Sequence, residues 1–333
     1  MNITYRNFVL EDVDHIINFW NQNSGWETNM DRVEFNIRFC SSPFGNPKIM
    51  LAIDNDISEI VGLFCFLPFD VTINNKEEKC YRFFGAVFKE SFREKFSITS
   101  SLTGNHPISK LYYKGVEQAI EENAVITYSI PDPRWSRILR VYPFEIYKFP
   151  LWSYKLSINN PIKLDNNTCV KDMNLTDTNI DSLWEQSPKN DICTLTRNSL
   201  LFQCKANIFH NRSKLKGLYF RDHLVGLFTL SYKSDAYQWT IGDILSLDND
   251  NTLKLTLRAA CFSAQLELSE KAIEPTKDYK ASILTTPLLE KKIKELNFYK
   301  DNYDFVFTVQ LINKGKVSKK EIGIENWNIS ATD

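Results

Sequence analysis

Cysteine and histidine are the side chains that most often act as nucleophiles, bases or metal ligands, and this chain has seven cysteines and four histidines. The cysteines are odd in number and widely scattered, without a CxxC pair and without a histidine at ligand spacing. This pattern predicts buried, reduced thiols, and no metal site built from residues close in sequence. The residues concerned are Cys40, Cys65, Cys80, Cys169, Cys193, Cys204, Cys261, His15, His106, His210 and His223.

A phosphate-binding loop is the second kind of chemistry to look for, because glycines let the backbone come close to an anion. The chain has only 11 Gly, and no group of them has the spacing of a GxGxxG motif. One segment still places a glycine just before a predicted helix, since Gly104 precedes Pro107 and proline favours the first helical position. Free backbone N–H groups and the helix dipole at such a position favour a bound anion.

Composition sets limits on the class of protein. The 40 Lys and Arg and the 41 Asp and Glu give a formal net charge of -1, which argues against a protein whose main partner is nucleic acid. A chain with 43% hydrophobic and 24% charged residues is typical of globular proteins. No apolar run approaches the ~18 residues of a membrane span, and the N-terminus lacks a secretion signal, which predicts a cytoplasmic protein.

The 333 residues predict two domains, and the sequence repeats itself accordingly. Ile60–Phe64 and Leu224–Phe228 are nearly the same pentapeptide. The two Asn and one Pro at Asn159–Pro161 interrupt the pattern between them. We therefore expect one domain over residues 1–158 and a second over 162–333.

The predicted elements recur in the same order in both halves, as two copies of a β-α-α-β-β-β-α-β-α-β unit. In the first half we expect strands at 3–8, 48–53, 60–73, 80–88, 125–130 and 144–156, and helices at 12–20, 30–39, 107–122 and 135–141. In the second half we expect strands at 169–173, 215–220, 224–232, 237–245, 280–284 and 305–311, and helices at 177–185, 197–209, 252–271 and 287–296.

Several short segments in this order carry a resemblance to a known family. They are Thr103–Leu111, Pro131–Pro133, Tyr142–Phe144 and Lys294–Phe298, in which Asn297 replaces a family glycine. Each half resembles the GNAT N-acetyltransferase superfamily, and the whole chain resembles tandem-GNAT bacterial acyltransferases. The resemblance implies an α/β (α+β) protein of two tandem GNAT-like domains, each a mixed, mostly antiparallel central sheet flanked by helices.

The resemblance also implies a binding site for the pyrophosphate of acetyl-CoA at the loop that precedes the helix at 107–122. The implied cofactor-binding residues are Thr103, Gly104, Asn105, His106, Pro107 and Ile108. Ser101 replaces the Arg or Gln of the family, and His106 stands at the second glycine, where its ring would either crowd the pyrophosphate or contact a phosphate oxygen. A rival register places Phe92–Phe96 in the loop and needs an insertion before the helix.

The corresponding loop of the second half is Leu247–Thr252. It lacks glycine, and two carboxylates, Asp248 and Asp250, would repel a phosphate. We therefore expect the second domain to be a degenerate copy that serves the structure or shapes the substrate site.

Acyl transfer from a thioester to an amine needs a base for the ammonium proton and an acid for the departing thiolate. The resemblance implies a tyrosine acid, which is Tyr142 by position, with Tyr147 as its alternative. For the base, Asp70 follows an apolar stretch and His106 could serve from the loop. Glu77, Glu78 and Asp132 are further alternatives.

Two more segments allow a functional and a structural interpretation. The closing segment 325–333 resembles the last Trp-to-Asp stretch of the family, so it either lines an acceptor pocket or is a strand anchored by Trp327. Arg134, Arg137 and Arg140 either meet an anionic substrate, such as the 3′-phosphate of CoA, or face solvent on a helix.

The sequence thus favours a GNAT-type N-acyltransferase that moves an acetyl or other acyl group from acyl-CoA to a small-molecule amine, for example a sugar nucleotide or a cell-envelope precursor. No metal is required for this reaction, and neither nucleic acid nor a membrane span is expected. The alternative is a catalytically silent tandem GNAT protein that binds a ligand or partner in a cleft between its domains.

Overall fold

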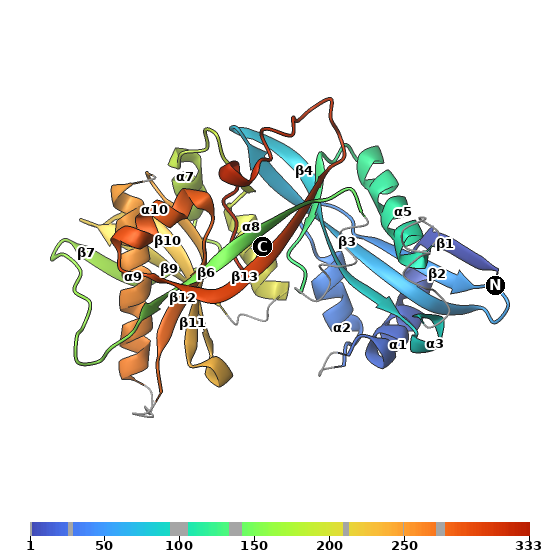
Figure 1. Ribbon diagram of the computed structural model, residues 1–333, viewed down its shortest axis with the longest axis horizontal. Coiled ribbons are helices and arrows are strands. Elements are labelled where there is room, and N and C mark those ends of the chain that lie inside the picture. Colours follow the sequence, from blue (N-terminus) through green and yellow to red (C-terminus); the bar gives the residue numbers. More distant parts are fainter. Residues whose placement is uncertain are drawn as a thin grey trace. The chain divides into compact units, whose positions relative to one another are not determined.

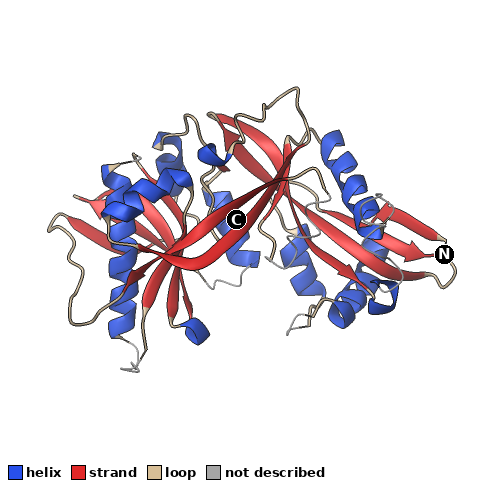
Figure 2. Ribbon diagram, viewed as in Figure 1, coloured by secondary structure: helices blue, strands red, loops and turns tan. Residues whose placement is uncertain are grey.

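The computed structural model describes residues 2–25, 29–93, 106–132, 142–208, 213–248, 250–270 and 277–333. Within them the chain is a mixed α/β protein of mostly antiparallel strands with helices packed against them (Figure 2). This confirms the fold class predicted from the sequence.

The chain divides into two compact units, which are drawn with their elements in Figure 1. Unit 1 comprises Met1–Val71, Glu77–Tyr147 and Val306–Lys319, and unit 2 comprises Thr72–Lys76, Lys148–Phe305 and Lys320–Asp333. The contacts thus divide the chain at Tyr147, ahead of the division expected near Asn159, and they place one late segment in unit 1.

Unit 1 contains a sheet in the order β1-β2-β3-β4-β5-β13. Neighbouring strands are antiparallel at β1/β2, β2/β3 and β5/β13, whereas β4 and β5 are parallel. The strands are β1 (Ile3–Asn7), β2 (Lys48–Asp54), β3 (Glu59–Ile73), β4 (Lys76–Phe88), β5 (Ile126–Ser129) and the second half of β13 (Tyr299–Leu311). The helices are α1 (Val13–Asn23), α2 (Arg32–Phe35), α3 (Glu90–Arg93) and α5 (Pro107–Glu121).

The helices of unit 1 lie on two faces of its sheet. In Figure 1, α5 is drawn above the strands of this unit, and α1 and α2 below them. The apolar side of α1 explains its position, because Ile16, Phe19 and Trp20 recur at helical spacing and are all buried. On the other face, Leu111 and Tyr112 of α5 pack into an aromatic cluster with the strands.

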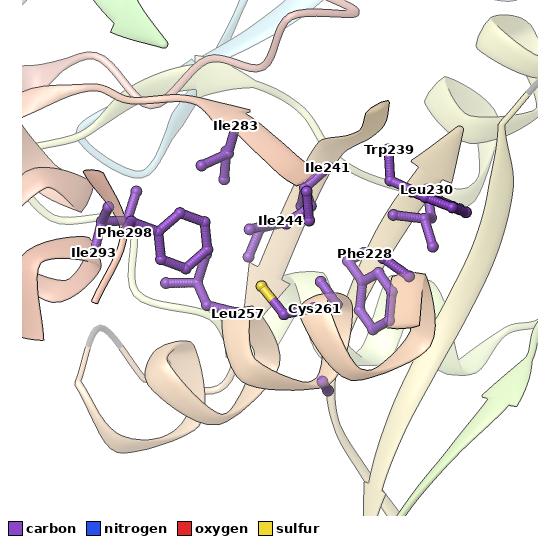
Figure 3. Packing of buried hydrophobic residues seen from close by; sticks show 14 of the residues in the cluster. Phe228, Leu230, Trp239, Ile241, Ile244, Leu257, Cys261, Ile283, Ile293 and Phe298 are labelled. Carbon is purple, nitrogen blue, oxygen red and sulfur yellow. The ribbon is translucent and has the colours of Figure 1, made fainter. Parts of the chain in front are cut away.

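Unit 2 repeats this plan with the strand order β6-β12-β11-β10-β9-β7. Its strands are β6 (Glu145–Lys155), β7 (Thr168–Asp172), β8 (Cys193–Leu195), β9 (Lys214–Phe220), β10 (His223–Lys233), β11 (Gln238–Ser246), β12 (Lys280–Leu284) and the first half of β13. Its helices are α7 (Asn179–Gln186), α8 (Ser199–Ile208), α9 (Asn251–Ser269) and α10 (Pro287–Glu295). Figure 3 shows the core of this unit, in which Phe228, Ile241 and Leu257 come from β10, β11 and α9.

The repeated pentapeptides occupy equivalent places in the two units. The first lies in β3, which is followed by β4, α5 and β5, and the second in β10, which is followed by β11, α9 and β12. Their shared glycines have a packing reason, because a Cβ added at Gly62 would lie 2.3 Å from the Phe88 ring, and one added at Gly226 would lie 2.1 Å from Thr256 Oγ1. The neighbouring element therefore approaches the strand too closely for a side chain at either position.

Strand β13 explains why the units do not follow the two halves of the sequence. Its first half belongs to unit 2, and its second half, from Val306, pairs with β5 in unit 1. The register joins Thr308 to Ser129 and Leu311 to Ile126. A late segment thus fills the edge of β5, which would otherwise expose unpaired backbone groups.

All seven cysteines are free thiols. The prediction that they are buried is confirmed for five of them and wrong for Cys40 and Cys169, which are exposed. In the part of the chain that the structure describes, no helix has both the length and the hydropathy needed to cross a membrane.

Candidate functional site

The two parallel strands β4 and β5 separate from each other in the middle of unit 1. Cys80–Arg82 pair with Ile126–Tyr128, and β5 then ends at Ser129, whereas β4 continues to Phe88. The later residues of β4 therefore have no partner in β5, and the space between the diverging chains is a cavity of about 300 Å³. A site of this size and partly apolar character suits a small-molecule ligand.

The walls of the cavity are mainly aromatic and come from both faces of the sheet. On the α5 face lie Ile108 and Tyr112, and on the α1 face lies Trp20. The remaining lining residues are Ser24, Phe64, Arg82, Phe83, Phe84, Gly85, Ala86, Val87, Ser129, Ile130, Pro131, Asp132, Tyr142 and Phe144. The cavity thus lies in the gap between β4 and β5 and is lined by residues from both faces of the sheet.

Gly85 interrupts the extended conformation of β4 at the cavity. Its φ of 64° lies in the left-handed region that side chains rarely adopt, and a Cβ there would lie 2.8 Å from the Trp20 ring. A glycine at this point lets the strand change direction, as residues at bulges next to active sites do.

The N-terminus of α5 lies beside this cavity. Pro107 takes the first helical position, as predicted, and Ile108 lines the cavity. His106 is the N-cap, and its Nδ1 accepts a hydrogen bond of 3.2 Å from the Ile108 N–H. Burial lowers the pKa of His106. The neutral ring therefore carries its proton on Nε2, and its other nitrogen satisfies one N–H group of the helix end.

The rest of the predicted cofactor loop, Thr103, Gly104 and Asn105, lies outside the described residues, as do the helix expected at 135–141 and the three arginines around it. In the rival register, Phe92 packs in parallel with the Phe88 ring at a centroid distance of 6.2 Å and is buried. That phenylalanine is part of the aromatic core of unit 1.

Tyr142, the predicted acid, lines the cavity. Its hydroxyl oxygen lies 3.0 Å from Ser109 Oγ of α5, and its ring is buried beside Tyr112 and Phe144. Burial raises the pKa of Tyr142 to about 12, so the hydroxyl keeps its proton at neutral pH. The alternative, Tyr147, stacks on Phe307 and does not line the cavity.

Asp70, a predicted base, lies in β3 and is not among the residues that line the cavity. It is half-buried, and burial, followed by the charge of Glu77, raises the pKa of Asp70 to about 6. Of the alternatives, Glu77 is exposed and Glu78 lies 3.3 Å from Lys316 Nζ, whereas Asp132 lines the cavity from an exposed position.

We expect the Asp70→Asn variant to be more stable than the native chain at pH 8, by about 1–2 kcal/mol after allowance for the partial exposure of the carboxyl. The folded-state pKa of Asp70 lies above its unfolded value of 3.8, so the folded state loses stability as the pH rises from about 4 through about 6. Urea unfolding at pH 8 and at pH 4 measures this difference, and the gain should vanish at the lower pH. Because Asp70 does not line the cavity, acyl transfer should be retained; a loss of about 100-fold would instead identify it as the base.

Unit 2 has a corresponding divergence with a much smaller space. The parallel strands β11 and β12 pair from Gln238 to Ile241, and β11 then continues beyond β12 to Ser246, still paired with β10, beside a hollow of about 70 Å³. At the N-terminus of α9, the Asp248 carboxylate accepts hydrogen bonds from the backbone N–H groups of Asp250 and Thr252, at 2.8 and 3.1 Å. The protein's own carboxylate thus takes the place at this helix end that an anionic ligand would use.

Sequence reasoning did not find a buried ionic cluster in unit 2. Arg197 Nε lies 3.2 Å from Asp243, Lys205 Nζ lies 2.8 Å from the same carboxylate, and both cations also contact Asp333. All four residues are buried. They lie far apart in the sequence, on α8, on β11 and in the segments around them, and only Asp333 belongs to a segment that the sequence singled out.

The closing segment is held in unit 2. Trp327 is buried and donates a hydrogen bond of 2.9 Å from its Nε1 to the Ile322 carbonyl oxygen, and Arg197 binds the Asn328 carbonyl oxygen at 3.1 Å. These contacts agree with the anchoring role expected for Trp327, but the expected strand is wrong: Ile324–Asn326 form a 3-10 helix, and Trp327 makes an isolated bridge with Cys193.

Comparison with known proteins identifies the fold. The divergent strands, the following helix and the cavity between them occur in a chain with the fold of the GCN5-related N-acetyltransferases. Three solved structures illustrate this. A probable N-acyltransferase of unknown function from Enterococcus faecalis has a TM-score of 0.67 and 10% identity, with 94% of this chain and 73% of that chain covered.

A GCN5-related N-acetyltransferase from Anabaena variabilis has a TM-score of 0.65 and 11% identity, with the same coverage of 94% and 73%. The N-myristoyltransferase of Saccharomyces cerevisiae, solved with bound myristoyl-CoA, has a TM-score of 0.54 and 9% identity, with 93% of this chain and 79% of that chain covered. No family model and no curated protein matches the sequence. The structural likeness therefore establishes the GNAT fold that the sequence motifs predicted.

Proposed function

We propose that this protein is an N-acyltransferase that takes an acetyl or other acyl group from acyl-CoA in unit 1 and transfers it to an amine. The observation that carries the proposal is the cavity of about 300 Å³ at the divergence of β4 and β5, beside the N-terminus of α5. A thioester and its acyl group fit an apolar space of this kind, and a helix N-terminus suits the phosphates of the same ligand. The yeast N-myristoyltransferase, which has this fold, contains bound myristoyl-CoA.

The reaction needs few protein groups. The neutral amine attacks the thioester carbonyl carbon, the C–N bond forms, the C–S bond breaks, and the CoA thiolate leaves with a proton supplied by an acid. Tyr142 lines the cavity and keeps its hydroxyl proton at neutral pH, so we assign it as this acid. His106 stays neutral because burial lowers its pKa, and its Nδ1 accepts the Ile108 N–H group, so this ring would take the amine proton only after that hydrogen bond breaks.

We assign donor binding to unit 1 alone. In unit 2 the hollow beside β11 is about 70 Å³, and Asp248 already binds the N–H groups at the start of α9. A phosphate there would meet a carboxylate instead of free donors. Unit 2 then serves the structure or shapes the acceptor site, and the use of acyl-CoA fits the cytoplasmic location expected from the sequence.

One observation favours the alternative, a catalytically silent protein that binds a ligand. His106 occupies the helix end where the family has glycine, and its ring already satisfies the Ile108 N–H group. If this ring excludes the pyrophosphate, acyl-CoA does not bind to the native chain.

Calorimetry with acetyl-CoA and with acyl-CoA of longer chains, on the native chain and on His106→Gly, separates these two functions. The enzyme predicts binding of one acyl-CoA per native chain, and release of CoA thiol when a pool of small amines is added. No binding by the native chain together with binding by the glycine variant would overturn the proposal, because the histidine would then be what closes the site.

A further inference from the structure

Arg82 is a cation that lines the cavity of unit 1. It lines the space between β4 and β5 and is half-buried, and its Nε is buried with no hydrogen-bond partner. Among the described residues, no ion pair or hydrogen bond of its side chain occurs. The other cavity residue with a charge is Asp132, which is exposed.

A guanidinium in such a position is costly for the folded chain. Its Nε–H group is removed from water without a hydrogen-bond acceptor, which destabilises the protein, and the aromatic neighbours supply no carboxylate to offset this. By contrast, the buried Arg197 is paired with Asp243. A cation kept unpaired in a ligand-sized cavity is therefore explained best by an anion on the ligand.

The position of Arg82 on β4 identifies which ligand it meets. Successive strand residues point to opposite faces, and Tyr81 and Phe83 pack into the cluster that contains Tyr112 of α5. Arg82 and Phe84 thus face the other side, where Phe84 stacks on Phe39.

The phosphates of the donor belong at the far end of the same strand. Phe88 contacts His106 at the start of α5, with ring centroids 6.3 Å apart, and it lies six residues beyond Arg82, which is roughly 20 Å along a strand. Arg82 therefore lies on the opposite face of the sheet from α5 and away from the phosphate end, where the second substrate would enter.

We propose that Arg82 binds a carboxylate of the acceptor, so that the acceptor is an amino acid or another amine that carries a carboxylate. This inference rests on the proposed acyl transfer and specifies its second substrate. The planar guanidinium can donate two parallel hydrogen bonds to a carboxylate. A single cation balances the single negative charge of a carboxylate, whereas a phosphate dianion would be left half compensated.

The test compares each of the proteinogenic amino acids with its carboxamide. Calorimetry measures the binding of each acid and each carboxamide to the native chain. The binding of acetyl-CoA is measured in a separate titration, and mass spectrometry detects the N-acylated product. We expect at least one free acid to bind about 10- to 100-fold more tightly than its carboxamide, the usual effect of a hydrogen-bonded charge pair. Arg82→Gln should abolish this preference and raise the KM for that acid more than it lowers kcat.

Two controls accompany Arg82→Gln. Lys79→Gln removes an exposed cation from the same strand outside the cavity, and it should keep the preference for the acid. Thermal unfolding shows whether Arg82 has a structural role instead. Because its removal leaves no carboxylate unpaired, Arg82→Gln should unfold at the same temperature as the native chain or at a higher one, and a lower temperature would support the structural role.

The outcomes distinguish a failure of the acceptor proposal from a failure of the acyltransferase proposal. The inference is overturned if acids and carboxamides bind alike, if Arg82→Gln keeps the preference, or if no free acid binds to a chain that does bind acetyl-CoA. If acetyl-CoA fails to bind but the preference exists and depends on Arg82, the acyltransferase proposal fails and the carboxylate site stands.

Discussion

Replacing Tyr142 by phenylalanine is expected to lower kcat for acyl transfer by about 100-fold or more, with the Kd for acyl-CoA unchanged. The hydroxyl lies in the cavity wall, 3.0 Å from Ser109 Oγ, and burial raises the pKa of Tyr142 to about 12. A group with this pKa stays protonated over the whole working range and can give its proton to the departing thiolate. The variant keeps the ring, and therefore the packing against Tyr112 and Phe144, while it removes only the proton donor.

Tyr113→Phe is the matched control for this variant. Tyr113 is the neighbour of Tyr112 on α5, its ring lies 6.3 Å from that of Tyr142, and it is exposed and outside the cavity lining. It should keep kcat within about twofold of the native value. Steady-state kinetics and calorimetry on both variants test the assignment. Equal rates for the two variants would remove Tyr142 from the mechanism, and a loss of acyl-CoA binding in Tyr142→Phe would make its role one of packing.

Much of the fold could be predicted because local patterns determine it. The near-identical pentapeptides at Ile60 and Leu224 revealed the repeat, and both lie in strands that precede the parallel pairs β4/β5 and β11/β12. Pro107 predicted the first turn of α5 correctly. These features depend on turn residues and on hydrophobic periodicity, which act over a few neighbouring positions.

The exchange of β13 could not be predicted in the same way. Its sequence indicates a strand, but no feature of that sequence predicts that the second half pairs with β5. Strand pairing over such a distance along the chain is decided by which edge is open in the folded protein. A division at Asn159 therefore follows the repeat in the sequence, whereas the contacts divide the chain at Tyr147 and within β13.

The candidate site was predicted in part. Tyr142 and Ile108 were found through their place after recognisable segments, and both line the cavity. Arg82 was missed because it lies inside a strand that looks like ordinary sheet, and only the absence of a partner in the folded chain distinguishes it. A charged residue in the apolar run Cys80–Phe88 is the signal that the sequence offered.

The buried ionic cluster of unit 2 was missed for a related reason. Four charges scattered from Arg197 to Asp333 look like ordinary surface residues until the fold brings them together. They balance as two cations and two carboxylates. The hydroxyl groups of Thr332 and Ser330 add hydrogen bonds of 3.1 and 3.3 Å to Asp243. Such a cluster is stable only as a complete set, because each remaining charge depends on the others.

Lys205→Met is accordingly expected to lower the free energy of unfolding by about 3–5 kcal/mol at pH 7. It leaves Asp243 and Asp333 with Arg197 as the one remaining cation of the cluster, so one buried carboxylate has no compensating charge. The double variant Lys205→Met/Asp243→Asn removes one charge of each sign and keeps the contact between Arg197 and Asp333, so it should recover a large part of this loss. Lys214→Met is the control, because Lys214 is exposed, its Nζ lies 3.0 Å from Glu267, and such a pair contributes about 0–1 kcal/mol.

The pH dependence of this loss identifies its electrostatic origin. Burial tends to raise the pKa of Asp243, but the charges of Lys205 and Arg197 outweigh it and lower the pKa to about 2. Since the folded-state pKa lies below the unfolded value of 3.8, the native cluster contributes stability above pH 4 and loses it as the pH falls from about 4 towards 2. Without Lys205 the Asp243 carboxylate is protonated more readily, so the difference between Lys205→Met and the native chain should shrink between pH 7 and pH 4. Urea unfolding at both pH values measures it, and a penalty that is equal at both would mean that lost packing of the lysine stem, and not an unpaired charge, causes the destabilisation.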